Sequence, residues 1–392
     1  MSKLIFLSIL LCGISYCTCA QWQQSAGTAG LNMQSLLSND TYNFAGGQTG
    51  AYVSSDSGAN YSPSNTGNDN VGPTRGFTKD ADYMYTCTSQ GAFRSSDNGA
   101  TWVSKSVGLT NLLGGGILKV GTRLFYVGPT GVFMSTNQGD AWSAAGLSTT
   151  DVRCITAIND TLFVGTNGAG IYKSTDWGAN WVQIINGLGN SANFRAIESK
   201  GNTLFAAGPI GTGVYRSSDF GVNWTLLGGG LASGSYRGFA SNSQVIVAGS
   251  FGAGVFYSTD NGDNWTAINN GLTDLTIFDL ELNDSHIIAA TNTQGVFRFP
   301  LADINLAAEN QALENKINLS IFPNPASNQL NVTCNSKLIG NRYEIYDNSG
   351  KLVLSGKITF ETTSVLLDSL TDGMYLIHVG SNEKKSFTII KG

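Results

Sequence analysis

Arginine recurs at one position along this chain, and its side chain is well suited to bind an anion. When the repeats described below are aligned on the second strand that we predict in each, the position nine residues earlier holds Met33, Arg75, Gly115, Arg153, Arg195, Arg237 and Ile277. A guanidinium group binds carboxylate, sulfate or phosphate through paired hydrogen bonds. Four arginines at one opening would form an anion site. Alternatively, each arginine is structural and bonds turn carbonyls between neighbouring repeats.

Groups that could catalyse hydrolysis are few. The carboxylates considered are Glu198, Glu281, Asp151, Asp274 and Asp279, none of which belongs to a recognisable motif. A two-carboxylate glycosidase needs a pair about 5 to 10 Å apart, and nothing in the sequence pairs these residues. His286 and His378 lie far apart, so we expect neither a histidine-based metal site nor a Ser-His-Asp triad. We therefore expect no cofactor and no metal.

The elements that carry these residues are six copies of one motif, Ser-x-Asp-x-Gly-x-x-aromatic. The central residues are Asp56, Asp97, Asn137, Asp176, Asp219 and Asp260, spaced 41, 40, 39, 43 and 41 residues apart. Asp and Ser side chains bond nearby backbone N–H groups, and Gly tolerates a left-handed conformation, so the motif predicts a tight turn. A cation site is the weaker alternative, because each copy supplies a single carboxylate.

Each repeat contains four short predicted strands in about 40 residues, which is typical of a β-propeller blade. A seventh unit is divided between the ends of the repeat region. Residues 286–299 repeat the two middle strands, and residues 22–27 resemble the outer strand of a blade. Joining them would close the ring without free edges. We predict an all-β fold with a seven-bladed propeller over residues 21–300, six blades being the alternative. The 49 glycines fit its many turns.

A different pattern follows a polar linker at residues 301–317. Residues 318–392 contain about seven short predicted strands, typical of a small β-sandwich. Three ordered motifs lie in this segment: Pro323-Asn324-Pro325, an Asp-x-x-Gly-Lys turn ending at Gly350 and Lys351, and a segment containing Gly373 and Tyr375.

Both regions resemble known families. The six-fold motif resembles the Asp-box, or BNR repeat, of sialidases and related bacterial propellers, which implies that a ligand binds on the face opposite the boxes. A sialidase would also need a Tyr nucleophile, and Tyr236 precedes Arg237, but catalytic insertions are missing. Residues 318–392 resemble the type A C-terminal sorting domain of type IX secretion substrates. That resemblance implies recognition by the secretion machinery, removal of the domain, and attachment to the cell surface or release.

The N-terminal segment agrees with export. Residues 1–20 read as a signal peptide, with Lys3, an apolar run over residues 4–14 and small residues before Gln21. A lipoprotein signal is the alternative, since three cysteines lie nearby. The remaining Cys87, Cys154 and Cys334 cannot form a disulfide framework.

Charge and hydropathy exclude some partners. The net charge of −5 and the lack of a basic stripe argue against nucleic acid, and no later segment is apolar enough to span a membrane. We expect a secreted, surface-displayed monomer that binds a glycan or another envelope component without turnover. An Asp-box glycoside hydrolase and a purely structural assembly propeller are the alternatives.

Overall fold

The computed structural model describes residues 21–39, 41–67, 72–209, 213–304, 319–334, 338–380 and 385–392. The predicted signal peptide and most of the predicted linker lie outside these ranges. The chain divides into two compact units, residues 1–304 and 305–392. Each is described by itself.

The described part of the first unit forms seven four-stranded antiparallel sheets, each a blade of a propeller. Blade 1 contains β2 (Met33–Ser38), β3 (Asn43–Gly47), β4 (Gly50–Ser54) and β5 (Ser62–Pro63), and blade 2 contains β6 (Thr74–Lys79), β7 (Met84–Thr88), β8 (Gly91–Ser95) and β9 (Val103–Ser104). Blade 3 contains β10 (Gly116–Val120), β11 (Arg123–Gly128), β12 (Gly131–Ser135) and β13 (Ser143–Ala144), and blade 4 contains β14 (Val152–Ile158), β15 (Thr161–Thr166), β16 (Ile171–Ser174) and β17 (Val182–Gln183). Blade 5 contains β18 (Ala196–Lys200), β19 (Thr203–Ala207), β20 (Val214–Ser217) and β21 (Thr225–Leu226), and blade 6 contains β22 (Tyr236–Ser241), β23 (Ile246–Ser250), β24 (Gly254–Ser258) and β25 (Thr266–Ala267). Blade 7 contains β26 (Ile277–Leu282), β27 (His286–Thr291), β28 (Val296–Pro300) and β1 (Gln23–Gln24).

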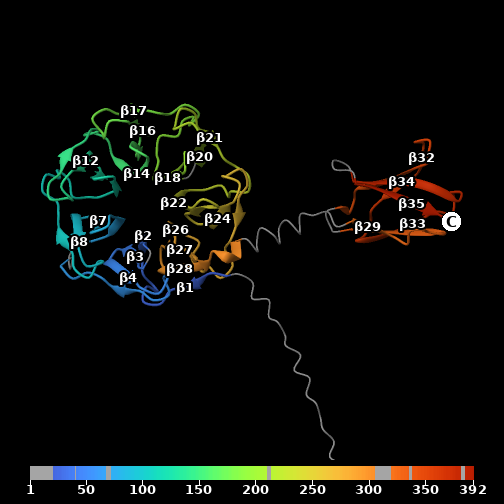
Figure 1. Ribbon diagram of the computed structural model, residues 1–392, viewed down its shortest axis with the longest axis horizontal. Helices are drawn as coiled ribbons and strands as arrows, with labels where there is room; N and C mark the ends of the chain where they lie inside the picture. Colours follow the sequence, from blue (N-terminus) through green and yellow to red (C-terminus); the bar gives the residue numbers. More distant parts are fainter. Residues whose placement is uncertain are drawn as a thin grey trace, which may run out of the picture. The chain divides into compact units, whose positions relative to one another are not determined.

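The blades follow one another around a ring, with the first strand of each innermost (Figure 1). Each innermost strand contacts those of both neighbouring blades, from β2 around to β26. The second strands are buried on both faces, as in β3 and β7, where every residue is buried. Such strands read as continuous apolar runs because blades cover both sides. The predicted seven-bladed, all-β propeller is confirmed.

The last blade is completed by β1, which is far from β28 in the sequence. In β1, Gln23 and Gln24 pair with Arg298 and Phe297 of β28. Trp22, just before β1, donates an Nε1–H bond to the carbonyl of Ile268 in blade 6. The motif aromatics Trp102, Trp142 and Trp181 bond the preceding blade in the same way. Trp22 therefore serves as the motif tryptophan of blade 7, although no motif precedes it.

The repeated motif forms one turn in each of six blades, between the third and fourth strands. In blade 4, Ser174 Oγ donates to Asp176 Oδ1 at 2.9 Å and accepts from the Gly178 N–H at 2.8 Å. The Asn180 N–H also donates to Asp176 Oδ1, at 2.9 Å. These bonds hold the pKa of the Asp176 carboxyl below its usual value, with the Asn180 side-chain bond the largest cause.

Asparagine makes the same two Oδ1 bonds at the centre of this turn. Asn137 Oδ1 accepts from Ser135 Oγ at 2.8 Å and from the Ala141 N–H at 3.0 Å. The six central residues Asp56, Asp97, Asn137, Asp176, Asp219 and Asp260 each bond a serine two residues earlier. Every one of them is occupied within its own turn.

The second unit contains two packed sheets. One has the order β29 (Leu319–Phe322), β30 (Gln329–Cys334), β33 (Thr362–Leu366), and the other has the order β32 (Leu352–Lys357), β31 (Arg342–Tyr346), β34 (Gly373–Val379), β35 (Lys385–Lys391). Their core includes Leu330, Val332, Ile345, Ile377 and Ile389, all fully buried. The predicted small β-sandwich is confirmed.

The sequence motifs of this unit occupy its turns. Asn324, between Pro323 and Pro325, bonds the backbone of β35 through Thr388 O and Ile390 N, both at 2.9 Å. In the Asp-x-x-Gly-Lys turn, Gly350 has a φ of 80° and the Lys351 N–H donates to Asp347 Oδ1 at 3.0 Å. At the start of β34, beside Gly373, the Tyr375 hydroxyl donates to the carbonyl of Thr371 at 2.8 Å.

Candidate functional site

The four predicted arginines line one cavity. It measures about 520 Å³ and lies between the innermost strands of the propeller. Arg75 lies in β6, Arg153 in β14 and Arg237 in β22, and Arg195 immediately precedes β18. Because each arginine starts an innermost strand, all lie at the mouth opposite the motif turns. We call this opening, with its four arginines, the arginine mouth.

A β-bulge sets the direction of three of the four arginine side chains. The strand pairing skips one residue in blades 2, 4 and 6, and the skipped residue is Arg75, Arg153 or Arg237. A bulge redirects a side chain and increases local twist. The same bulge holds Gln34 in blade 1 and Phe278 in blade 7.

The alignment that put Met33 and Ile277 at this position is therefore wrong by one residue. Strand pairing sets Asn43 opposite Ser38 and Ile287 opposite Leu282, as Met84 is set opposite Lys79. The residues equivalent to Met84 are thus Asn43 and Ile287, one position later than in the sequence alignment. Gln34 and Phe278 line the cavity in place of Met33 and Ile277.

Three of the arginines have unused hydrogen-bonding capacity. Among the described residues, Arg75, Arg195 and Arg237 form no ion pair, whereas Arg153 pairs with Asp151. The buried Nε atoms of Arg75, Arg153 and Arg237 have no hydrogen-bond partner. A buried donor without a partner costs about 1 to 3 kcal/mol, and a bound anion would supply acceptors.

Arg237 is held between two aromatic rings. Its guanidinium carbon lies 4.0 Å from the ring centre of Phe251 and 5.1 Å from that of Phe278. Burial, and then the charge of Arg195, lower the pKa of Arg237. The mouth therefore concentrates positive charge, and stacking on the rings leaves the guanidinium edge open to an acceptor.

Three carboxyl groups line the same cavity, a grouping that the sequence analysis missed. They are Glu198 in β18 and Asp279 and Glu281 in β26, together called the acid cluster below. Asp279 follows the bulge position by one residue, and Glu198 and Glu281 each follow it by three. Strands rise about 3.3 Å per residue, so the two glutamates start roughly 10 Å deeper than the arginines.

The acid cluster is tied to the strands around it. Asp279 accepts N–H bonds from Leu36 in blade 1 at 2.8 Å and from Leu280 at 2.9 Å. Glu198 Oε1 accepts from Ser241 Oγ in blade 6 at 3.0 Å. Burial raises the pKa of Asp279 and that of Glu198 to about 7. Burial, and then the charges of Asp279 and Glu198, raise the pKa of Glu281.

Other residues considered for chemistry have structural roles. Asp151 accepts from Asn167 as well as from Arg153, and Asp274 accepts from the Thr293 N–H at 2.7 Å. The buried Tyr236 hydroxyl donates to the carbonyl of Ala232 at 2.8 Å.

The histidines and acids give no metal geometry in the part of the chain that is described. His286 and His378 bond Ser285 and Ser386, each through Nδ1. No group of three or more His, Cys, Asp or Glu side chains within the described ranges is arranged to hold a metal ion. A helix able to cross a bilayer is likewise not found among the described residues.

The C-terminal unit matches a known family. Residues 320–391 match the family described as the secretion system C-terminal sorting domain. The chain thus ends in a type IX sorting domain, and the protein is exported to the cell surface or the extracellular medium. No curated protein matches the chain.

Solved structures support the propeller fold. PorZ, a surface component of the type IX secretion system of Porphyromonas gingivalis, matches with 13% identity and a TM-score of 0.57, covering 94% of this chain and 60% of that one. The GH74 enzyme of Niastella koreensis matches with 18% identity and a TM-score of 0.55, covering 70% and 43%. YCF48 from Cyanidioschyzon merolae matches with 14% identity and a TM-score of 0.56, covering 72% and 99%. This chain spans less than two thirds of the PorZ and GH74 structures.

Proposed function

We propose that the exported propeller is a non-catalytic binding module whose arginine mouth takes the anionic group of a glycan or another envelope component. The observation that carries this proposal is the convergence of four arginines on one cavity, three of them without an ion pair among the described residues. A structural arginine that only ties blades together would satisfy its donors within the protein. Here, three Nε atoms are unsatisfied.

The rings around Arg237 support a planar acceptor. Phe251 is 40% exposed, so an apolar surface lies beside the stacked guanidinium. A carboxylate on a sugar ring would place its oxygens at the guanidinium edge and its carbon atoms against the phenyl rings. Carboxylates bind arginine through two parallel N–H bonds, a geometry that lysine does not provide.

The test compares binding with folding. Arg75→Met and Arg195→Met are made singly and together in the mature chain. Arg342→Met, in the C-terminal unit, removes the same charge away from the cavity. Binding is measured on an array of carboxylated and sulfated glycans, and stability by thermal unfolding. We expect the double variant to lose binding at least tenfold while the control keeps it. Unchanged binding with lower stability would refute the proposal.

The acid cluster supports a second candidate, a glycoside hydrolase of the Asp-box type. It puts carboxyl groups with raised pKa values beside one another in a cavity, as an acid and base pair requires. Against it, both oxygens of Asp279 already accept backbone N–H bonds. Hydrolysis of fluorogenic sialosides or polysaccharides that Glu281→Gln abolishes would establish the enzyme.

A further inference from the structure

Two adjoining hollows lie on the face of the propeller that carries the motif turns, away from the arginine mouth. The first, between blades 1 and 2, measures about 290 Å³, and the second, between blades 7 and 1, about 170 Å³. Asn39, Thr41 and Lys79 line both, so the hollows are neighbours on either side of one turn. Asn98 lines the first hollow and Ser57 the second, and both belong to motif turns. We call the pair the twin hollow.

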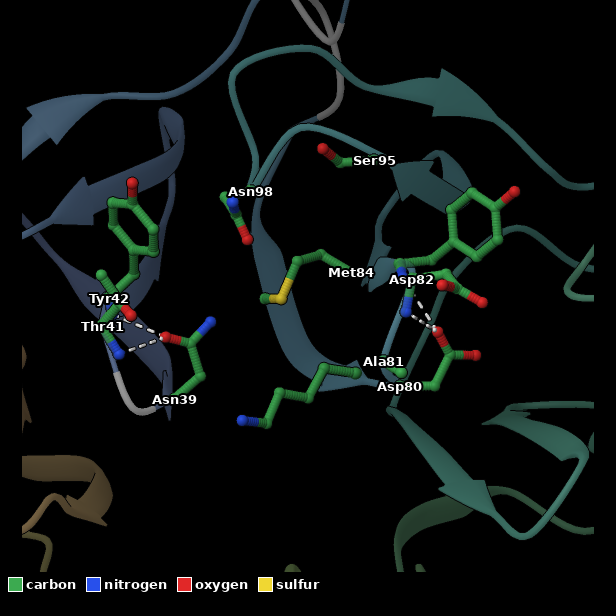
Figure 2. A pocket seen from close by; sticks show the side chains of 11 residues that line it. Asn39, Thr41, Tyr42, Asp80, Ala81, Asp82, Met84, Ser95 and Asn98 are labelled. Atoms are coloured by element: carbon green, nitrogen blue, oxygen red, sulfur yellow. Dashed lines mark hydrogen bonds between the residues drawn. The ribbon is translucent and has the colours of Figure 1, made fainter.

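Two hairpin turns of the same design form the walls of the first hollow. Asn39 Oδ1 accepts from the N–H groups of Thr41 at 3.0 Å and Tyr42 at 2.6 Å. Asp80 Oδ1 accepts from those of Asp82 at 3.1 Å and Tyr83 at 2.8 Å. Figure 2 shows these bonds on opposite sides of the hollow, with Met84 and Asn98 between them. The turns are therefore held by their own side chains before any ligand binds.

The two tyrosines occupy one repeat position. Tyr42 precedes Asn43 in blade 1 as Tyr83 precedes Met84 in blade 2, and both line the hollow. In the other blades this position holds Arg123, Thr161, Thr203, Val245 and His286. The paired tyrosines are thus specific to blades 1 and 2, whereas a residue needed by every blade would recur around the ring.

Several polar groups in the first hollow are free. The side chains of Thr41, Lys79, Asp82 and Asn98 make no hydrogen bond or ion pair with any described residue. Asp80 differs, because its Oδ2 accepts from Lys119 Nζ at 2.6 Å and from the Tyr85 hydroxyl at 2.9 Å. The hollow is lined mainly by polar groups, several of them unused, with two tyrosines among them, a lining that suits a ligand rich in hydrogen-bonding groups.

We propose that the twin hollow binds a neutral oligosaccharide, with one sugar unit in each half. Tyr42 offers a flat apolar ring surface to the C–H face of a sugar, and Tyr83 offers the ring face away from Arg94, whose guanidinium carbon lies 4.6 Å from the Tyr83 ring centre. Sugar hydroxyls donate and accept, which matches a mixed set of ammonium, carboxylate and amide groups. Lys79 lines both hollows and is balanced by Asp82 in the first and Asp284 in the second, so the lining carries no excess charge that would select a charged ligand. This site is separate from the arginine mouth, and its existence does not depend on the function proposed there.

The test uses the mature full-length chain and five neutral probes: cellotetraose, laminaritetraose, mannotetraose, chitotetraose and a xyloglucan heptasaccharide. Binding is measured by saturation-transfer NMR and calorimetry for the wild type, Tyr42→Ala and Asp82→Asn. The matched controls are Tyr172→Ala, in blade 4, and Arg195→Met, in the arginine mouth. We expect at least one probe to bind, with affinity at least tenfold lower in both hollow variants and unchanged in both controls.

The proposal is overturned if no probe binds at millimolar concentration, or if a probe binds equally well to Tyr42→Ala and Asp82→Asn. Asp82 is exposed, so its substitution leaves the fold intact and keeps the test decisive if Tyr42→Ala unfolds. Loss of neutral-sugar binding in Arg195→Met would also overturn it, because the ligand would then lie in the channel.

Discussion

The acid cluster makes the stability of the propeller depend on pH in an unusual direction. An acid whose folded pKa is raised binds more protons in the folded state, so its contribution to stability is lost as pH rises from the unfolded pKa to the folded pKa. For Glu198 and Asp279 that window runs from about 4, typical of unfolded carboxyls, to about 7. Glu281 changes stability in the same direction.

The size of the effect follows from the width of this window. Three pH units at about 1.4 kcal/mol each set an upper bound of about 4 kcal/mol for a single carboxyl. All three side chains are half-buried, and their charges interact. For Glu198 and for Asp279, a net loss on the order of 2 kcal/mol each between pH 4 and 7 is the expected magnitude. The carboxyls of the motif turns have the opposite effect, because their pKa values are lowered, to about 2 for Asp56. Their contribution to the stability of the fold is lost only in strong acid.

Tryptophan fluorescence makes the measurement specific to this unit, because all seven tryptophans lie between residues 22 and 265. Urea unfolding of the mature chain at pH 5 and pH 8 compares the wild type, Glu281→Gln and Asp160→Asn, an exposed control at a hairpin turn. We expect the wild type to be less stable at pH 8, and Glu281→Gln to recover part of the difference. Equal or greater wild-type stability at pH 8, with no recovery in Glu281→Gln, would contradict the reasoning.

Three further predictions concern the fold and are checked by thermal and urea unfolding. Asp260→Asn is expected to cost less than Asp260→Ala, since it keeps the two Oδ1 bonds that Asn137 makes in blade 3 and loses only the Asn264 side-chain bond to Oδ2, whereas Asp260→Ala loses all three hydrogen bonds and costs about 1 kcal/mol after allowance for solvent exposure. Trp22→Ala removes a 97% buried ring that joins the last blade to blade 6, and we expect a loss of about 3 to 5 kcal/mol with earlier aggregation; a change under 1 kcal/mol would show that β1 does not close the ring in solution. Gly238→Ala places a methyl carbon 2.7 Å from the Cα atom of Asp279, so blades 6 and 7 must separate and stability should fall, while wild-type stability would disprove that close packing.

The repeats made most of the fold predictable, whereas a one-residue error in the alignment of blades 1 and 7 limited the prediction of the site. Six motifs fixed the spacing of the blades, and the fragments at both ends of the propeller indicated the seventh. In blade 7 the alignment started one residue early, which placed Ile277 where the structure has Phe278. Since side chains of a strand alternate between faces, a slip of one residue moves each to the wrong side.

That slip also hid the acid cluster. With the observed register, Glu198 and Glu281 lie at one repeat position, three residues after Arg195 and Phe278. This coincidence was the available signal that both face the channel. The role of Asp279 was harder to predict from the sequence. Its hydrogen-bond partner, the Leu36 N–H, lies 243 positions away in the chain and becomes a neighbour only because the ring closes.

The order of charges along the channel constrains how a ligand could sit in it. The two glutamates start about 10 Å deeper than the arginines, and charges at that separation interact by roughly 2 kcal/mol at an effective dielectric constant near 20, less than in a close ion pair. Asp279 instead accepts backbone N–H bonds and Glu198 accepts from Ser241, so the hydrogen bonds recorded for these two acids do not involve the arginines. An anion that entered deeper would leave the guanidinium donors and approach carboxyls that repel it when ionised. The geometry therefore favours a ligand whose charged group stops at the mouth and whose neutral part alone extends inward.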